Sequence, residues 1–315
     1  MDPKDLGTVN SDLMTGRYGG AGASAAWQTV LDLYYQDRLR EAFDHALALG
    51  VGDGAYGTHT YRMVEAEWRA REYGEIREFS DVLIVEAPKE MEESSWEWLL
   101  EAVRSEFEEV CQRLGYEPVE KVLVSLMVPE SDAPWTPYRH GFCVDKVPYD
   151  KVVLPLGLMR NEGHFRNGLR HEFGHVVNLN LAQGRMGMWL EEAIAMRMGG
   201  DVDGRYVVQL KQGAPIWMGP EELSEAFVGD RRGATGEGLW RAYEQAGLIG
   251  QYLGELRGDF ALGDVARAMA NNSTWKEIAM RVTGQSDEDE ALREVFGMGE
   301  DEVFLRAFEA AVEST

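Results

Sequence analysis

The sequence predicts an α+β protein in which a mixed sheet is followed by a mostly helical second half. Three short apolar runs, at 82–85, 121–128 and 151–155, are typical of buried strands. Segments with apolar residues at helical spacing surround these runs, and beyond residue 200 the pattern is almost entirely helical. A chain of 315 residues with 44% hydrophobic residues can form two domains, or one large domain with an appendage.

The first part of the chain, residues 1–76, is expected to hold a flexible glycine-rich start and a helical hairpin. Apolar residues recur at helical spacing from 25 to 49, glycines between 50 and 57 interrupt the pattern, and 58–73 gives a second helix rich in Glu and Arg. One helix pair is not a repeat array, so no solenoid is expected.

Two further regions are expected, residues 77–200 and 201–315. The first should contain a strand at 82–85, a helix at 91–114, strands at 121–128 and 151–155, and helices at 169–181 and 188–195. The second should be mostly helical, because glycine-containing breaks separate its apolar-periodic segments.

The expected helix at 169–181 carries the sequence His171-Glu172-Phe173-Gly174-His175. Positions four apart lie on one face of a helix, so His171 and His175 can bind one ion together. Glu172 lies one residue along, where it can reach a water without being a ligand. This is the H-E-x-x-H arrangement of zinc peptidases, in which zinc lowers the pKa of a water to about 7 and the glutamate accepts its proton.

A chance match to this short pattern would instead be a buried helix with two satisfied histidines and an exposed glutamate. The surrounding helix is largely apolar, as expected for a domain interior, and buried histidines need partners. This context favours the metal interpretation. The remaining histidines near the motif are His140, in a loop before a strand, and His164, two helical turns before His171.

A catalytic zinc site needs a third protein ligand. The metzincin pattern is excluded, because Asn178 and Leu181 stand where it has Gly and His. Glu191 and Glu192 follow on the next apolar helix, and both lie on apolar faces, so periodicity does not decide between them. Asp201 is a further candidate of the kind that aspartate zincins use.

The segment Met188–Ala195 resembles the Trp-Leu-x-Glu-Gly-x-Ala signature of gluzincins of the aminopeptidase and peptidase-MA-like type. Trp189, Leu190, Glu192 and Ala195 match, whereas Ala193 replaces the usual glycine. The resemblance implies that Glu192 is the third zinc ligand and that Glu191 is a variable flank. It also implies a gluzincin-like catalytic domain, with a mixed sheet and active-site helix above a helical lower subdomain.

A second catalytic residue is implied by the helix that begins near Leu239. Tyr243 and Glu244 resemble the Tyr-Glu-x-Gly helix of zinc aminopeptidases, although Ala246 stands at the glycine position. The resemblance implies that the Tyr243 hydroxyl stabilises the oxyanion of the tetrahedral intermediate, and such a donor is worth roughly 3 kcal/mol. The structural alternative is a half-buried core aromatic.

The resemblance also implies where substrate binds. In gluzincins an edge strand beside the active-site helix pairs with extended peptide, and this role falls to Val152, Val153 and Leu154. The Gly-x-Met-Glu-Asn segment that anchors a substrate amine in aminopeptidases is absent from the chain. Endopeptidase action is therefore favoured over amino-terminal trimming.

Composition limits the partners and the compartment. The net charge of −24 argues against nucleic acid and anionic membranes, and no apolar run approaches 18 residues. The first residues lack a signal-peptide pattern, and Cys111 and Cys143 alone do not form a disulfide framework. A cytoplasmic protein is expected, with its oligomeric state left open.

The expected function is that of a zinc metallopeptidase with Zn²⁺ as cofactor and a peptide or protein as substrate. Two alternatives remain open. One is a zinc-stabilised binding module without turnover, and the other is an adaptor whose working surface is the helical hairpin.

Overall fold

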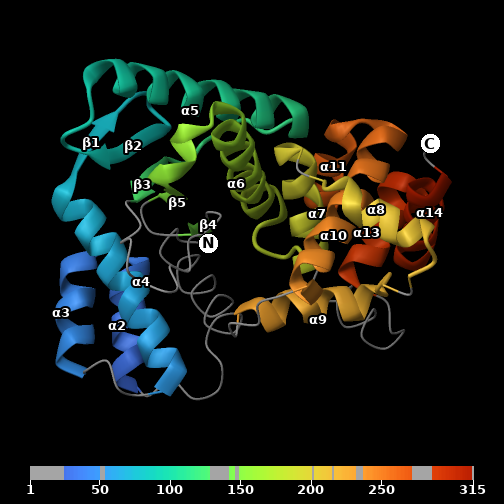
Figure 1. The fold of residues 1–315 in the computed structure, drawn as a ribbon, viewed down its shortest axis with the longest axis horizontal. Coiled ribbons are helices and arrows are strands. Elements are labelled where there is room, and N and C mark those ends of the chain that lie inside the picture. Colours follow the sequence, from blue (N-terminus) through green and yellow to red (C-terminus); the bar gives the residue numbers. More distant parts are fainter. Residues whose placement is uncertain are drawn as a thin grey trace. The chain divides into compact units, whose positions relative to one another are not determined.

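The computed structural model describes residues 25–49, 54–127, 142–145, 149–200, 202–214, 216–231, 237–271 and 286–313 (Figure 1). As the sequence predicts, these residues form a mixed α+β protein that is mostly helical. They divide into two compact units, unit 1 within Met1–Ser105 and Pro118–Gly168, and unit 2 within Glu106–Glu117 and Leu169–Thr315. The limits at 105 and 168 fall inside helices α5 (Glu93–Leu114) and α6 (Glu162–Ala182), and none coincides with the expected boundaries at 76 and 200.

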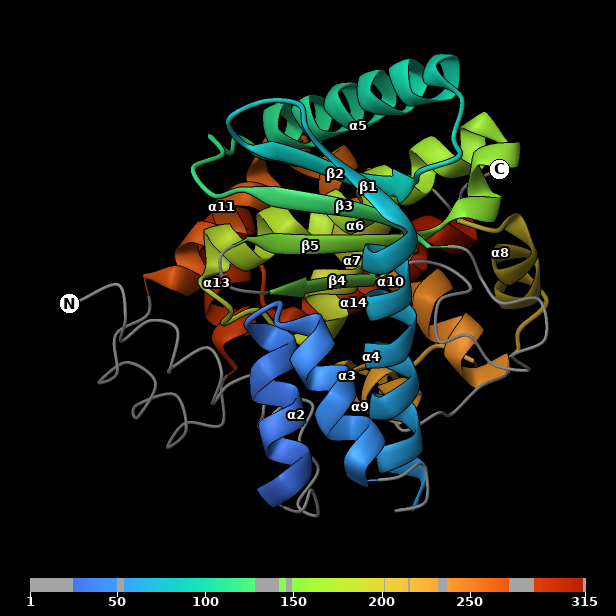
Figure 2. The same cartoon turned by 90° about the vertical axis from the view of Figure 1, so that its left-hand side faces the viewer.

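Unit 1 contains a five-stranded sheet with the order β1-β2-β3-β5-β4 (Figure 2). Its strands are β1 (Gly74–Glu78), β2 (Leu83–Pro88), β3 (Val122–Met127), β4 (Phe142–Asp145) and β5 (Asp150–Pro155). Strands β2, β3 and β5 are parallel, and β1 and β4 pair antiparallel at the two edges. The three inner strands are buried along almost their whole length, which is why they stand out as continuous apolar runs.

Three helices precede the sheet, α2 (Ala25–Tyr35), α3 (Leu39–Leu49) and α4 (Gly54–Tyr73). The expectation of one continuous helix from 25 to 49 is wrong. The chain turns at Asp37, which adopts a positive φ of 53°, a conformation that ends a right-handed helix. The three helices share a core, and α4 also packs on the sheet, where Met127 and Val153 are covered by apolar residues of the helix.

A group of buried charges also joins α4 to the sheet, and we call it the lysine cluster: Asp37, Glu67, Arg71, Glu86 and Lys151. The Lys151 side chain is fully buried, and its Nζ lies 2.8 Å from Oε2 of Glu67 and 3.8 Å from Oε2 of Glu86. Arg71 pairs with Glu86 and with Asp37. Each of the three carboxylates therefore lies beside a cation inside unit 1.

Hydroxyl groups complete the lysine cluster. Tyr34 donates a hydrogen bond to Glu67, Ser125 donates to Glu86 over 2.7 Å, and Tyr149 donates to Asp37. Buried charges are tolerated when they are paired and hydrogen-bonded in this way. The cluster therefore anchors the helices to the sheet.

Unit 2 is helical. It contains α7 (Met188–Gly199), α8 (Gly204–Lys211), α9 (Pro220–Arg231), α10 (Glu237–Arg257), α11 (Asp259–Ala270), α13 (Asp287–Phe296) and α14 (Glu300–Glu313), with the end of α5 (Glu93–Leu114) and most of α6 (Glu162–Ala182). No described helix is long and apolar enough to cross a membrane.

Helix α7 lies at the centre of unit 2, and nine of its twelve residues are buried. Helix α10 approaches it closely through Gly250, where an added Cβ would lie 2.0 Å from the carbonyl oxygen of Ala193. Helix α6 approaches α7 through Gly174, where an added Cβ would lie 3.0 Å from Cα of Ala195. Glycines on its two neighbours thus fix the position of α7.

Candidate metal centre

The two histidines of the H-E-x-x-H sequence lie one turn apart on α6 and face each other. Their Nε2 atoms are 3.2 Å apart, as the four-residue spacing on a helix allows. The helix is held in unit 2 by Phe173, whose ring packs on Phe107 at 5.0 Å between centroids, and by Arg170, which bonds Glu106 over 2.6 Å. The histidines therefore project from a helix that is fixed by packing and by an ion pair.

Helix α7 supplies the third member of the group, Glu192. Its Oε2 lies 3.7 Å from Nε2 of His171 and 3.5 Å from Nε2 of His175. The contact depends on the close approach of α6 and α7 at Gly174. We call these residues, His171, His175 and Glu192, the metal centre, because one ligand atom from each lies within 4.8 Å of the others.

The donor atoms of the metal centre fit a single ion. Two atoms bound tetrahedrally at about 2.1 Å from a metal are themselves about 3.4 Å apart. The three separations found here are 3.2, 3.5 and 3.7 Å. Two imidazole nitrogens and one carboxylate oxygen can therefore hold a metal ion without large movement of the helices.

Glu172 is buried beside the metal centre. Its Oε2 has no hydrogen-bond partner among the described residues, which is costly for a carboxylate unless something else compensates it. Burial raises the pKa of Glu172 to about 8, with His175 opposing the rise and Glu192 and Glu191 adding to it. The unpartnered Oε2 is thus available to a group that enters the site.

The charge balance favours a cation. Burial opposes a charged His175, but the negative charges of Glu192 and Glu191 outweigh it and hold the pKa of His175 well above its usual 6.5. A metal ion would satisfy the same demand for positive charge and leave the imidazole neutral, as ligation requires.

Glu191 also belongs to the surroundings of the metal centre. Its Oε1 lies 3.3 Å from Nδ1 of His175, on the side of the ring away from the metal-centre atoms. The resemblance to gluzincins gave Glu191 no role at the site, whereas in the structure Glu191 and Glu192 both lie beside His175. The consecutive acids Glu191 and Glu192 after the H-E-x-x-H helix are visible in the sequence. Only the structure shows that they approach different nitrogens of His175.

Tyr243 lies on α10, on the same helix face as Gly247 and Gly250. Its ring packs edge-on against Phe227 of α9, with 5.1 Å between centroids. The neighbouring Glu244 accepts a hydrogen bond over 2.6 Å from the backbone N–H of Asp203 at the start of α8, which is a structural contact. The oxyanion role of Tyr243 stays a prediction.

The expectation that Val152, Val153 and Leu154 form an edge strand is wrong. Strand β5 lies between β3 and β4, so Val152 and Val153 have a paired strand on both sides, and Leu154 pairs with Leu126 of β3. All three side chains are fully buried. An extended peptide cannot add to a strand whose hydrogen-bonding groups are already used.

The remaining candidates do not extend the metal centre. His164 lies exposed in the first turn of α6, and its N–H bonds Oδ1 of Asn161 over 3.2 Å. His140 and Asp201 lie outside the described residues.

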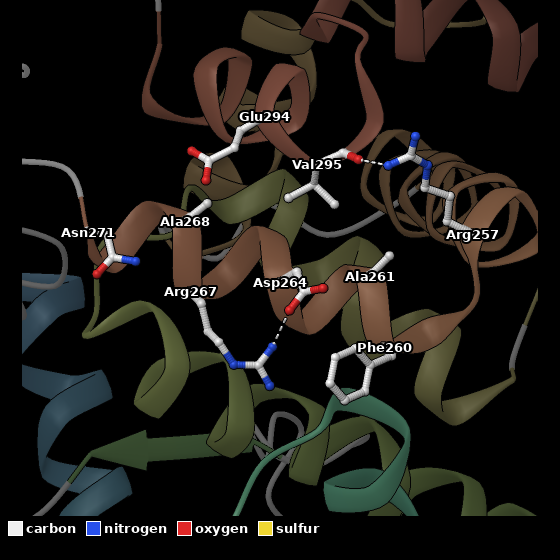
Figure 3. A pocket seen from close by; sticks show the side chains of 9 residues that line it. All are labelled: Arg257, Phe260, Ala261, Asp264, Arg267, Ala268, Asn271, Glu294 and Val295. Carbon is white, nitrogen blue, oxygen red and sulfur yellow. Dashed lines mark hydrogen bonds and ion pairs between the residues drawn. The ribbon is translucent and has the colours of Figure 1, made fainter.

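A separate cavity of about 560 Å³ lies along α11 and contains none of the predicted site residues (Figure 3). Three of its charged side chains bond within the protein: Arg267 pairs with Asp264 over 2.7 Å, and Arg257 donates to the carbonyl of Val295. The metal centre, with the unpartnered Oε2 of Glu172 beside it, is therefore a better candidate for chemistry than this cavity.

Comparisons with protein-family models, with curated proteins and with solved structures found no match.

Proposed function

We propose that this protein is a zinc-dependent peptide-bond hydrolase of the gluzincin type, acting as an endopeptidase. The observation that carries the proposal is the group formed by His171, His175 and Glu192 with the buried Glu172 beside it. This donor set, two histidines and a glutamate, is the ligand set of several zinc peptidases.

When bound, zinc would polarise a substrate carbonyl and lower the pKa of a water molecule. His171, His175 and Glu192 would hold the ion. Glu172 would accept a proton from the attacking water and later return it to the leaving amine, because it is the carboxylate next to the ligands that is not itself a ligand. Burial of Glu172 excludes bulk water from that proton transfer.

The non-catalytic alternatives have less support. A metal site that only stabilises a binding module needs its ligands but has no use for Glu172, whose buried Oε2 lacks a hydrogen-bond partner at a cost in free energy. A helical hairpin that acts as an adaptor should be separable from the rest of the protein. Here α4 contributes Glu67, which pairs with the buried Lys151 of the sheet. Removal of residues 1–76 would therefore leave Lys151 without this partner.

The test is the substitution Glu172→Gln, which keeps shape and removes the base. We expect the variant to retain stoichiometric zinc and to lose hydrolysis by roughly 10²–10⁴-fold. Zinc is measured by elemental analysis, and cleavage of a peptide library is followed by mass spectrometry with and without chelator.

The matched control is Glu162→Gln, an exposed carboxylate of the same helix. It should leave both zinc content and cleavage unchanged. Full activity in Glu172→Gln would exclude the proposed mechanism, and loss of zinc from that variant would make Glu172 a ligand instead of a base.

A further inference from the structure

The His175 ring has carboxylates on two sides. Its Nε2 lies 3.5 Å from Glu192 and 3.2 Å from Nε2 of His171, within the metal centre. Its Nδ1 lies 3.3 Å from Oε1 of Glu191, outside it. Glu191 and Glu192 are consecutive residues of α7, so one short segment fixes the ring at both nitrogens.

This arrangement determines which nitrogen carries the proton when a metal is bound. A neutral imidazole has one N–H and one lone pair, and the lone pair must point at the metal. An ionised Glu191 can only accept, so it selects the form in which Nδ1–H donates to it and Nε2 is left for the ion. A carboxylate in this position also raises the basicity of the ligand and fixes the orientation of the ring.

Glu191 is itself held in place. Its side chain is only 20% exposed. The Nδ2 group of Asn178 reaches the backbone carbonyl of Glu191 at 3.5 Å, and the backbone N–H of Glu191 bonds the carbonyl of Gly187 over 3.0 Å. Asn178 is fully buried and lies one turn beyond His175 on α6. It therefore joins α6 to α7 beside the imidazole that Glu191 contacts.

We infer that Glu191 is a positioning residue that orients His175 for metal binding, with Asn178 supporting its backbone. The inference rests on the proposed function, because it assigns a role toward the same bound ion. This role for Glu191 goes beyond what the resemblance to gluzincins implies, because in that signature the position before the ligand glutamate is variable.

The competing explanation is a plain ion pair between Glu191 and a protonated His175, with no consequence for the metal. The two explanations differ in metal affinity. An orienting carboxylate is worth about 10–100-fold in affinity. An ion pair that exists only without metal competes with the ion, so its removal would leave affinity unchanged or increase it.

The test is Zn²⁺ affinity, measured by competition with a chelating dye, for wild type, Glu191→Ala and Glu191→Gln. We expect Glu191→Ala to bind Zn²⁺ about 10–100-fold more weakly. Glu191→Gln should lose less, because its amide oxygen still accepts from Nδ1–H. The absorption spectrum of the Co²⁺-loaded protein should shift in Glu191→Ala, as expected when a ligand ring changes orientation.

The matched control is again Glu162→Gln, which should bind Zn²⁺ like wild type. Thermal unfolding of the metal-free proteins shows whether each variant folds, and the near-isosteric Glu191→Gln keeps the test valid if Glu191→Ala does not. Wild-type affinity in both variants would overturn the inference while leaving the proposed function intact. Absence of Zn²⁺ binding by the wild type would instead overturn the proposed function.

Discussion

The lysine cluster of unit 1 and the metal centre of unit 2 both place carboxylates inside the protein, but they neutralise them differently. In the lysine cluster, Glu67 and Glu86 meet the ammonium group of Lys151, and Glu86 also meets Arg71. Beside the metal centre, the positive charge that acts on Glu172 comes from His175, an imidazole whose pKa is raised above its usual 6.5 by Glu192 and Glu191. The lysine cluster contains its own cations, whereas the metal centre has a donor set that could hold a metal ion.

A third arrangement lies at the start of α7. Glu288 receives a hydrogen bond from the backbone N–H of Gly187, and burial raises its pKa. Burial also raises the pKa of the nearby Glu300 to about 7. Burial therefore favours the protonated, neutral form of both acids. The negative charge of buried carboxylates is thus offset by cationic side chains, by protonation and, we propose, by a metal ion. Only the metal ion would have an open coordination position at which chemistry can occur.

The largest effect is expected from a substitution that disrupts the lysine cluster. Lys151→Met should lower the free energy of unfolding by about 3–5 kcal/mol, because it leaves Glu67 and Glu86 buried without their cation. Chemical denaturation measures the change. The control Lys121→Met, at a solvent-exposed ion pair, should stay within about 0.5 kcal/mol of wild type. Equal effects of the two substitutions would show that the buried cluster carries no special stability.

The second largest effect is expected from a substitution that removes a ligand of the metal centre. Glu192→Ala should weaken Zn²⁺ binding by more than about 100-fold, since a direct ligand matters more than the orienting groups that are worth 10–100-fold. The stability of the metal-free protein should not fall, because the substitution removes a buried negative charge. Dye competition and denaturation of the metal-free protein measure the two quantities. A large loss of metal-free stability would mean that Glu192 is structural, like Glu67.

The third effect disturbs the helix that carries Glu191 and Glu192. Gly250→Ala would place a Cβ 2.0 Å from the carbonyl oxygen of Ala193, so α10 and α7 must move apart. We expect a loss of about 1–3 kcal/mol in the free energy of unfolding and weaker Zn²⁺ binding. Gly238→Ala, on the same helix with open space at the Cβ position, is the control and should be neutral or stabilising. Equal stability and equal Zn²⁺ affinity of the two variants would show that close packing at Gly250 does not position α7.

The smallest effect concerns the protonated acids. A carboxyl group whose pKa is raised from 4.5 in the unfolded chain to about 7 in the folded protein binds more protons when folded, so its contribution to stability falls between about pH 4.5 and 7. Glu300→Gln should flatten this decline and stabilise the protein by on the order of 1 kcal/mol at pH 8, after allowance for partial exposure. Thermal unfolding from pH 5 to 8 tests it, and parallel curves for the two proteins would contradict it.

The sequence predicted those elements whose local pattern and burial agree. The three inner strands are continuous apolar runs because both of their faces are covered. Helices α5 and α7 were expected within a few residues of where they lie, whereas α6 begins at Glu162, well before the expected start at 169. The turn at Asp37 was missed, because apolar spacing continues across it. The position of β5 inside the sheet was missed as well, because strand order depends on long-range pairing with β4.

For the metal centre, the sequence identified His171, His175 and Glu192, and the structure brings these three together. Four-residue spacing on a helix is a local property and can be predicted from sequence. The contact of Glu191 with His175 depends on how α7 is rotated against α6, and this is set by the packing at Gly174. Helical periodicity alone cannot supply that rotation.

The most direct test of the central claim is the metal content of the purified protein, compared with that of a His171→Ala/His175→Ala variant. After incubation with zinc and removal of the excess, elemental analysis should find one zinc per wild-type chain and essentially none in the variant. A wild-type protein that folds normally and retains no divalent metal, or a variant that retains as much as wild type, would contradict the account.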